Sequence, residues 1–273
     1  MAITTAASGM SLKEERSAED PATLYDRAFF RQIAGGSSRS AARIVPELLW
    51  LIAPESVVDV GCGQGIWLAE FQRHGVADVL GIDGAWVEQR EFLAGSDRFL
   101  AHDLRQALAL DRRFELVITL EVAEHLPPER SESFVADLVA LGPVIAFSAS
   151  ILDCTGTGEV NQQWPDYWAG LFAAFDYAPL DCLRFKIWDD AQIDWWYRQN
   201  LILYAHRDYI AARPHLRQLL AEQPPRVRRL VHPENYVEKT RLLLEPNLMH
   251  LLRALPRATL RATARRLRSR VTR

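Results

Sequence analysis

A glycine-rich loop follows a short apolar run near position 60. Residues 57–65 read VVDVGCGQG, with glycine at every second position of the loop, and apolar residues at helical spacing begin near Trp67. Glycine has no Cβ and tolerates positive φ, so such a loop lets the backbone approach a ligand closely. The start of the helix behind it favours a carboxylate or phosphate group. The pattern therefore indicates a ligand site, with a tight turn that binds nothing as the alternative.

The spacing of this loop excludes two common ligand sites. The third small residue of a dinucleotide-binding fingerprint falls here on Ile66, which is too large for close packing of helix and strand. No Lys-Ser or Lys-Thr pair follows the loop, so it is not a phosphate-binding Walker loop.

Two aspartates follow the next apolar runs. Asp83 ends the run 79–82 and lies 22 positions after Gly61, where an acid can accept hydrogen bonds from both hydroxyls of a ribose. Asp103 follows the run 98–101, where its side-chain oxygen can accept from an adenine amino group. Taken alone, each aspartate fits a strand-end cap or a solvated carboxylate. Their order behind the glycine loop indicates a nucleoside site.

Acid–base chemistry is possible after the fourth apolar run, which covers residues 116–119. If a helix starts here, Glu121, Glu124 and His125 share one face at the carboxyl end of the sheet, where open α/β folds bind ligands. We then expect Glu121 to contact the ligand and His125 to act as a general base, with Glu124 as its substitute. The alternative for His125 is a histidine that packs near the sheet edge.

The elements that position these residues alternate between short apolar runs and helix-like stretches, which is typical of a parallel sheet covered on both faces. The predicted strands are 56–60, 79–82, 98–101, 116–119 and 144–148, with helices near 67–74, 86–92 and 131–141. Later residues predict a helix over 165–175 and two antiparallel final strands over 183–188 and 200–206. Before the first strand, Gly35-Gly36-Ser37-Ser38 interrupts the helical spacing, so residues 21–51 are predicted to form two helices joined by a turn.

Composition places the chain among globular proteins. Its 273 residues are 49% hydrophobic and 25% charged, which excludes fibrous and mainly disordered classes. Three cysteines without CxxC spacing predict neither a disulfide framework nor a zinc knuckle, and they favour a cytoplasmic location. We expect a disordered segment over 1–20 and one domain over 21–210, in which 21–51 are the N-terminal helices and 151–199 a substrate or lid region. A helical basic extension over 211–273 follows.

The charge is unevenly distributed along the chain. From Arg213 to Arg273 there are 15 basic and four acidic residues, a net charge of +11, whereas the rest carries −14. The acidic part is a poor partner for nucleic acid, so no DNA binding is expected. The arginines after Arg253 alternate with leucines, and an amphipathic basic helix there can contact an anionic surface. A solvated helix without a partner is the alternative, and the oligomeric state stays open.

Several of these segments together resemble a known family. Residues 59–65 (DVGCGQG), 81–83 (GID), 103–104 (DL) and 121–126 (EVAEHL) are similar to the ordered motifs of class I, Rossmann-like S-adenosylmethionine-dependent methyltransferases. The resemblance covers about residues 57–206 and implies a doubly wound, seven-stranded, mostly parallel sheet whose last strand is antiparallel. It implies S-adenosylmethionine as cofactor, held by Asp59, Gly61, Cys62, Gly63, Gly65, Trp67, Asp83, Gly84, Asp103, Leu104 and Glu121.

A looser similarity concerns the methyl acceptor. Residues 158–168 (GEVNQQWPDYW) and 195–200 (WWYRQN) are similar to bacterial members associated with glycan or specialised-metabolite modification. The many aromatic residues here either form a lid or flat acceptor pocket, or fill the interface between the sheet and an inserted helix. The predicted acceptor residues are Tyr25, Asn161, Gln163, Trp164, Tyr167, Trp168 and Trp196. Asn161 and Gln163 have an alternative role as caps of the helix that follows.

Two missing motifs narrow the reaction. The fourth strand is not followed by Asp/Asn-Pro-Pro-aromatic, the motif of enzymes that methylate nucleobase amines, and the acidic set of magnesium-dependent catechol methyltransferases is absent. These absences favour a reaction without a metal. Together with the looser similarity, which implies a sugar-containing or specialised metabolite as acceptor, we expect O-methylation at a hydroxyl or carboxylate. The alternatives are N-methylation of a metabolite amine and a cofactor-binding scaffold without catalysis. RNA methylation is disfavoured by the acidic body and kept open by the basic tail.

Overall fold

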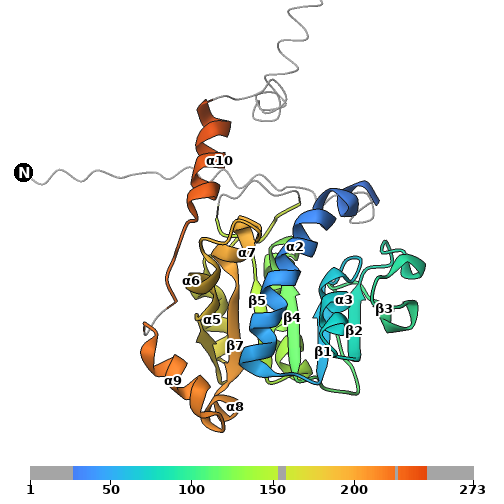
Figure 1. Ribbon diagram of the computed structural model, residues 1–273, viewed down its shortest axis with the longest axis horizontal. Coiled ribbons are helices and arrows are strands. Elements are labelled where there is room, and N and C mark those ends of the chain that lie inside the picture. Colours follow the sequence, from blue (N-terminus) through green and yellow to red (C-terminus); the bar gives the residue numbers. More distant parts are fainter. Residues whose placement is uncertain (1–26, 153–157, 225–226, 245–273) are drawn as a thin grey trace, which may run out of the picture.

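The computed structural model describes residues 27–152, 158–224 and 227–244, and within these ranges the chain forms one seven-stranded sheet (Figure 1). The predicted disordered segment, Tyr25 and the arginine-rich tail lie outside the described residues. The strand order is β3-β2-β1-β4-β5-β7-β6. The strands are β1 (Ser56–Val60), β2 (Asp78–Asp83), β3 (Phe99–Ala101), β4 (Leu116–Leu120), β5 (Val144–Ser148), β6 (Tyr177–Leu180) and β7 (Ile202–His206).

The strand directions confirm the predicted α/β fold. β1 to β5 pair in parallel, whereas β7 runs antiparallel to both β5 and β6. All five residues of β4 and of β5 are buried, as expected for strands covered on both faces. The carboxyl ends of the parallel strands therefore meet along one edge of the sheet, which is where such folds bind ligands.

Helices cover both faces of the sheet. One hydrophobic cluster joins Val57 of β1 to α2 (Arg27–Ile52), α3 (Ile66–Arg73), α6 (Leu183–Ile187) and α7 (Trp195–Asn200). A second cluster joins the next residue, Val58, to α4 (Ser131–Leu141) and α5 (Pro165–Ala173). Because successive side chains of a strand point to opposite faces, this division shows that the sheet is doubly wound.

The N-terminal segment differs from its prediction. Residues 27–52 form one continuous helix, α2, which runs through both glycines instead of turning at them. A Cβ on Gly36 would lie 2.9 Å from Cγ of Asp194, just before α7, and closer still to one of its oxygens. The glycine therefore allows α2 to approach α7, and this packing offsets the low helix propensity of glycine.

The prediction of a strand over 183–188 is wrong. The strand is β6, six residues earlier, and Leu183–Ile187 forms helix α6. The alternation of apolar and charged residues there resembled a strand. In the structure Arg184 is fully buried beside Leu183, whereas Phe185 is exposed, so burial follows a helical pattern.

Two further predicted helices are only single 3₁₀ turns. Residues 86–92 contain one turn, Gln89–Glu91, and the flanking rings pack against glycines, Trp86 against Gly84 and Phe92 against Gly65 and Gly81. After β4 a turn covers Ala123–His125, and Glu121 has a left-handed φ of 57°. The residues at 121, 124 and 125 therefore do not share one face of a helix.

The chain after β7 returns to the carboxyl edge of the sheet. α8 (Arg207–Ala211) and α9 (Pro214–Glu222) lie at the opposite edge, and α10 (Pro233–Leu244) begins beside α7 (Figure 1). Among the described residues, none of the helices combines the length and apolar character needed to cross a membrane.

Candidate active site

The glycine loop connects β1 to α3 and packs against the turn after β4. Gly61, Gly63 and Gly65 all have positive φ, at 88°, 49° and 79°. A Cβ on Gly61 would overlap the methyl groups of Val122. Glycine at this position therefore brings the turn that carries Glu121 directly against the loop.

Two other glycines of the predicted site make room for aromatic rings. A Cβ on Gly65 would lie 2.6 Å from the ring of Phe92, and one on Gly84 would overlap the ring of Trp86. Cys62 of the loop is buried, and its Sγ would lie 2.8 Å from a Cβ on Gly81 of β2. These glycines therefore serve internal packing, a role that the spacing alone did not distinguish from ligand approach.

Asp83 joins the end of β2 to the glycine loop. Its Oδ2 accepts a hydrogen bond from the backbone N–H of Gly63 at 2.8 Å, and its Oδ1 accepts one from Gly84 at 2.6 Å. Burial raises the pKa of Asp83 to about 6, and these two hydrogen bonds oppose that rise. Asp83 therefore lies at the predicted position, next to Gly63, with a carboxylate that already fixes the loop.

Asp59 lies in β1 just before the glycine loop. Its side chain is buried, and its Oδ2 has no hydrogen-bond partner among the described residues. Burial, and next the charge of Asp83, raise the pKa of Asp59 well above its usual value. A buried carboxyl oxygen without a donor is costly, so this position fits a cationic or hydrogen-bond-donating ligand group.

Asp103 follows β3 and is held by its neighbour Arg105. The guanidinium of Arg105 donates to both carboxylate oxygens, at 2.7 Å to Oδ2, and its backbone N–H donates to Oδ1 at 3.0 Å. The hydrogen bond from Arg105 lowers the pKa of Asp103. Leu104 between them is buried. The three N–H donors of Arg105 leave acceptor capacity on this partly exposed carboxylate for an adenine amino group.

Glu121 is half-buried at the end of β4, beside β5 and α7. Its backbone N–H donates to the Ser148 hydroxyl at 3.1 Å, and Asn200 Nδ2 donates to its Oε1 at 3.2 Å and its Oε2 at 3.4 Å. Burial raises the pKa of Glu121 to about 7, opposed by hydrogen bonds from Ser148 and Asn200. A carboxyl group that titrates near neutral pH at this edge is suited to proton transfer.

Glu124 lies one turn further and is almost fully buried. Its Oε1 accepts from the backbone N–H of Ser150 at 3.1 Å, and its Oε2 has no hydrogen-bond partner within the described ranges. Burial, and next the charge of Glu121, raise its pKa well above the usual value. The two carboxyl groups therefore titrate as a pair, and burial raises the pKa of both.

His125 is half-buried at the end of the same turn. Burial lowers the pKa of its imidazole to about 4, and a hydrogen bond to the backbone of Gly158 opposes this shift. The ring is therefore neutral at pH 7, but it is a much weaker base than an exposed histidine.

Aromatic side chains close the site on the side of α2 and α7. Trp67, the second residue of α3, packs edge-on against Tyr197 at a centroid distance of 5.2 Å, and Trp196 packs against the same ring at 5.9 Å. Burial raises the pKa of Tyr197 to about 12, opposed by a hydrogen bond with Ser37 of α2. Of the predicted residues, Trp67 and Trp196 thus share this contact with Tyr197.

The first three predicted acceptor residues after β5 make contacts within the protein. Asn161 is buried, and its Nδ2 donates to the Ser131 hydroxyl at 2.8 Å, so it fixes this segment to the start of α4. Gln163 donates to Asn161 Oδ1 at 3.2 Å. Trp164, at the N-cap position of α5, lies under the Arg229 guanidinium, and neither amide caps this helix.

The last two predicted acceptor residues are neighbours in α5 with different surroundings. Trp168 packs against Phe147 in the second hydrophobic cluster and is fully buried. Tyr167 is 37% exposed and contacts Trp168 edge-on. Only the exposed ring is thus accessible to a ligand in this structure.

Sequence reasoning did not select Asn200, which holds the Glu121 carboxylate. The available signal was the run Arg198-Gln199-Asn200 directly before an apolar strand, and all three of these polar residues are buried. Buried polar groups need partners, so such a run indicates an internal hydrogen-bond network.

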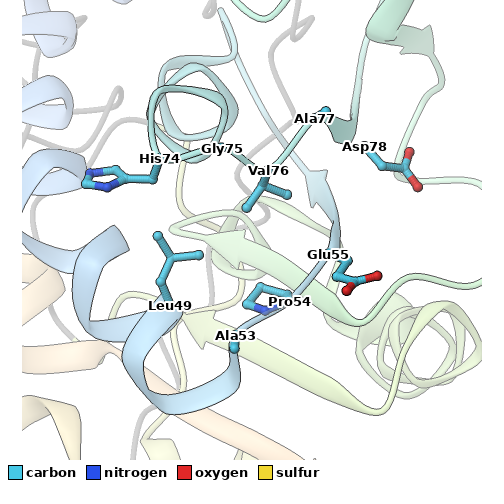
Figure 2. A pocket seen from close by; sticks show the side chains of 9 residues that line it. All are labelled: Leu49, Ala53, Pro54, Glu55, His74, Gly75, Val76, Ala77 and Asp78. Carbon is cyan, nitrogen blue, oxygen red and sulfur yellow. The ribbon is translucent and has the colours of Figure 1, made fainter.

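A shallow pocket of about 520 Å³ lies at the opposite edge of the sheet, before β1 and β2 (Figure 2). It is lined by Leu49, Ala53, Pro54, Glu55, His74, Gly75, Val76, Ala77 and Asp78. Its His74 pairs with Glu70, and its Asp78 with Arg112. None of the predicted site residues lines this pocket, so the candidate site is described by the residues at the carboxyl edge instead. No cluster of three or more His, Cys, Asp or Glu side chains within the described ranges could hold a metal ion.

Solved structures match this chain at low sequence identity, and some of them are described as methyltransferases. CalS10, an amino pentose methyltransferase from Micromonospora echinaspora, is 14% identical over 66% of this chain and 95% of its own, with a TM-score of 0.49. Magnesium protoporphyrin IX methyltransferase from Synechocystis is 15% identical over 62% and 84%, with a TM-score of 0.44. DesVI from Streptomyces venezuelae is 20% identical over half of this chain, with a TM-score of 0.37, and the match spans 59% of its length.

The sequence itself identifies the family. A search of curated proteins finds no match. The family model described as a methyltransferase domain matches residues 29–169, which is just over half of the chain and includes the glycine loop, Asp83, Glu121 and His125. This match, on a seven-stranded sheet with an antiparallel β7, shows that the protein belongs to the class I S-adenosylmethionine-dependent methyltransferases.

Proposed function

We propose that this methyltransferase acts on an oxygen atom of a small acceptor, a sugar-containing or specialised metabolite. The observation that carries the proposal is the carboxyl pair Glu121 and Glu124 at the edge of β4, packed against the glycine loop, with a pKa of about 7 at Glu121. A hydroxyl acceptor needs a base for its proton, whereas a carboxylate or a free amine needs little or none.

The residues around the loop fit S-adenosylmethionine. The buried Asp59 Oδ2, which has no donor among the described residues, suits the ammonium of its methionine part. The N-terminus of α3, where Gly65 supplies no side-chain cap, suits the methionine carboxylate. Asp83 is the proposed acceptor for the ribose hydroxyls, and Asp103 remains the proposed contact for adenine.

When bound, S-adenosylmethionine supplies a methyl group on a cationic sulfur. The chain has to hold the acceptor oxygen in line with that methyl group and exclude water, and positioning of this kind supplies much of the acceleration. We propose that the half-buried Glu121 and the ring cluster of Trp67, Tyr197 and Trp196 face the acceptor from one side. On the other side we propose Gln163, Trp164 and the exposed ring of Tyr167 as acceptor contacts.

The acceptor proton is proposed to pass to the carboxyl pair. A base works best when its pKa lies near the working pH, and Glu121 has a pKa of about 7. His125 was the first base candidate in the sequence, but its pKa of about 4 makes it a weak proton acceptor. We therefore assign proton uptake to Glu121 with the proton-bearing Glu124 beside it, and a hydrogen-bonding role toward the acceptor to His125.

The test is transfer of labelled methyl from S-adenosylmethionine into a metabolite extract, treated beforehand with nuclease, followed by mass identification of the product. We expect a small product methylated at oxygen. A product methylated at nitrogen would make the enzyme an N-methyltransferase. Cofactor binding without any labelled product would support a scaffold, and activity that nuclease treatment removes would indicate RNA as the acceptor.

A further inference from the structure

A buried hydrogen-bond network connects the C-terminal segment of the chain to Glu121. At its centre is Gln199 of α7, whose side chain is fully buried. Gln199 Oε1 accepts from the backbone N–H of His232 at 2.8 Å and from Asn235 Nδ2 at 2.9 Å. Its Nε2 donates to Asn200 Oδ1 at 2.9 Å, and Asn200 Nδ2 donates to the Glu121 carboxylate.

The two donors from the C-terminal segment set the orientation of each amide in this network. Because His232 and Asn235 both donate, the oxygen of Gln199 must face them, and its NH₂ group must face Asn200. The oxygen of Asn200 is then occupied, so its NH₂ group faces Glu121. With either amide reversed, two oxygen atoms would face each other, and a buried pair of this kind is costly.

Buried groups of α6 and α7 hold the C-terminal segment in place. The fully buried Arg184 pairs with Asp181 and donates to the backbone oxygens of Gln199 at 3.2 Å and Arg228 at 3.0 Å. Arg198 forms a 2.5 Å ion pair with Glu234. The segment around 228–235 is thus anchored at Arg228, before the residues that donate to Gln199, and at Glu234, between them.

We propose that Gln199 is a positioning residue, which transmits the docking of residues 232–235 through Asn200 to the carboxylate of Glu121. The inference rests on the proposed function, in which Glu121 lies at the site of methyl transfer. It assigns a role at the active site to a part of the chain that lies beyond the residues matched by the family model.

Loss of this positioning has a predictable electrostatic result. The groups that act on Glu121 are Glu159 after β5, which raises its pKa, Ser148 and Asn200, which lower it, and the neighbouring Glu124 and Tyr197. If the amide of Asn200 turns away, Glu121 loses a hydrogen bond that stabilises its charged form. The carboxyl group then keeps its proton to higher pH.

The experiment is calorimetric binding of S-adenosylmethionine and S-adenosylhomocysteine to the full-length protein between pH 6 and 9. Only S-adenosylmethionine carries the positive sulfonium, so its affinity relative to the homocysteine compound should rise as Glu121 loses its proton. In Gln199→Met the midpoint of this rise should lie about one pH unit higher than in the parent. The amino group of each free ligand titrates identically in every experiment, so a difference in midpoint between variant and parent arises from groups of the protein.

Gln223→Met is the matched control. Gln223 accepts from the Asp181 N–H at 2.8 Å and donates to the Pro179 oxygen at 2.6 Å. It contacts the network only through the backbone of Asp181, the ion-pair partner of Arg184, and its amide bonds to none of Gln199, Asn200 and Glu121. It should lower the melting temperature and leave the midpoint unchanged. If Gln199→Met does not fold, Asn235→Leu removes one of the two donors to Gln199 and should move the midpoint in the same direction by a smaller amount.

Two outcomes separate this inference from the function on which it rests. If Glu121→Gln leaves the ratio of the two affinities unchanged at every pH, Glu121 does not lie at the site. If Glu121→Gln makes the ratio independent of pH but the folded Gln199 or Asn235 variant keeps the parent midpoint, Glu121 lies at the site and Gln199 does not position it.

Discussion

The ionisable residues at the carboxyl edge take their properties from burial more than from their type. Burial raises the pKa of Asp59, Asp83, Glu121 and Glu124, and lowers that of His125. In each case the charged form is disfavoured, which is the expected effect of removing a charge from water. The proposed binding of a cationic cofactor at this edge would stabilise the charged form of these carboxyl groups.

Asp59→Asn tests whether the buried carboxyl group lowers the stability of the fold while it strengthens cofactor binding. The folded-state pKa of Asp59 is raised, so the carboxyl destabilises the fold increasingly as pH rises above its unfolded pKa of about 3.9. The amide should therefore raise the melting temperature of the ligand-free protein at pH 7, with the difference disappearing near pH 4. Calorimetry should show at least about tenfold weaker binding of S-adenosylmethionine, the loss of a hydrogen bond to a charged group. Unchanged affinity would exclude Asp59 from the cofactor site.

The pH dependence of turnover distinguishes the two bases. With Glu121 as base, the rate on the identified acceptor should rise with pH and level off above about 7. The imidazole of His125, with a pKa of about 4, is already neutral throughout this range. His125→Ala should therefore keep the midpoint, and Glu121→Gln should remove it and lower turnover by roughly 10²–10⁴-fold. A midpoint that disappears in His125→Ala and remains in Glu121→Gln would return the base role to His125.

At the scale of elements, the sequence predicts what depends on local pattern. The first five strands and α4 and α5 follow apolar runs and helical spacing, and the structure confirms them to within a few residues. The continuous α2 and the helix α6 were not predictable in this way, because their reasons are distant contacts. Gly36 approaches Asp194, and the buried Arg184 donates to Gln199 and Arg228 as well as to its near neighbour Asp181.

In the predicted site, too, the sequence motifs predict the positions of residues but not the distant contacts that hold them. The family motifs place Asp59, Asp83 and Glu121 around the glycine loop, where the structure has them. The motifs do not indicate that Arg105 holds Asp103, or that Asn200 holds Glu121. Partners of this kind depend on how loops fold back, and the left-handed φ of Glu121 has no signal in its sequence neighbours.

The contact between α2 and α7 can be tested with two adjacent glycines. A Cβ on Gly36 would overlap Asp194, whereas one on Gly35 would lie 3.6 Å from a flexible Arg39 guanidinium. Gly35→Ala should stabilise the protein by about 1 kcal/mol through helix propensity. Gly36→Ala gains the same propensity but should be destabilising by about 1–2 kcal/mol overall, because of the overlap. Denaturant unfolding measures both, and equal stabilisation by the two changes would show that α2 does not pack closely on α7.

The whole molecule combines an acidic body with a basic C-terminal part. The domain boundary that the charge predicts differs from the one that the structure supports. The boundary predicted at residue 210 follows composition. The described segment 227–244, however, shares buried hydrogen bonds with α6 and α7 through Arg228, His232 and Asn235. We therefore propose that the methyltransferase unit extends at least to residue 244. Contact of the remaining arginine-rich residues with an anionic surface stays a prediction.

Two truncations test where the folded unit ends. A chain that ends at Leu244 loses eight arginines and none of the described contacts, so its melting temperature and its affinity for S-adenosylmethionine should match the parent. A chain that ends at residue 226 also leaves Arg184, Arg198 and Gln199 without partners from the segment.

Each buried polar group without a partner costs about 1–3 kcal/mol, so the shorter chain loses a large part of a typical stability of about 5–15 kcal/mol. It should unfold well below the parent temperature and bind the cofactor weakly. Circular dichroism and calorimetry measure both properties. If the shorter chain melts with the parent, the C-terminal segment is dispensable for the fold. If the longer one fails to fold, residues after 244 belong to the core.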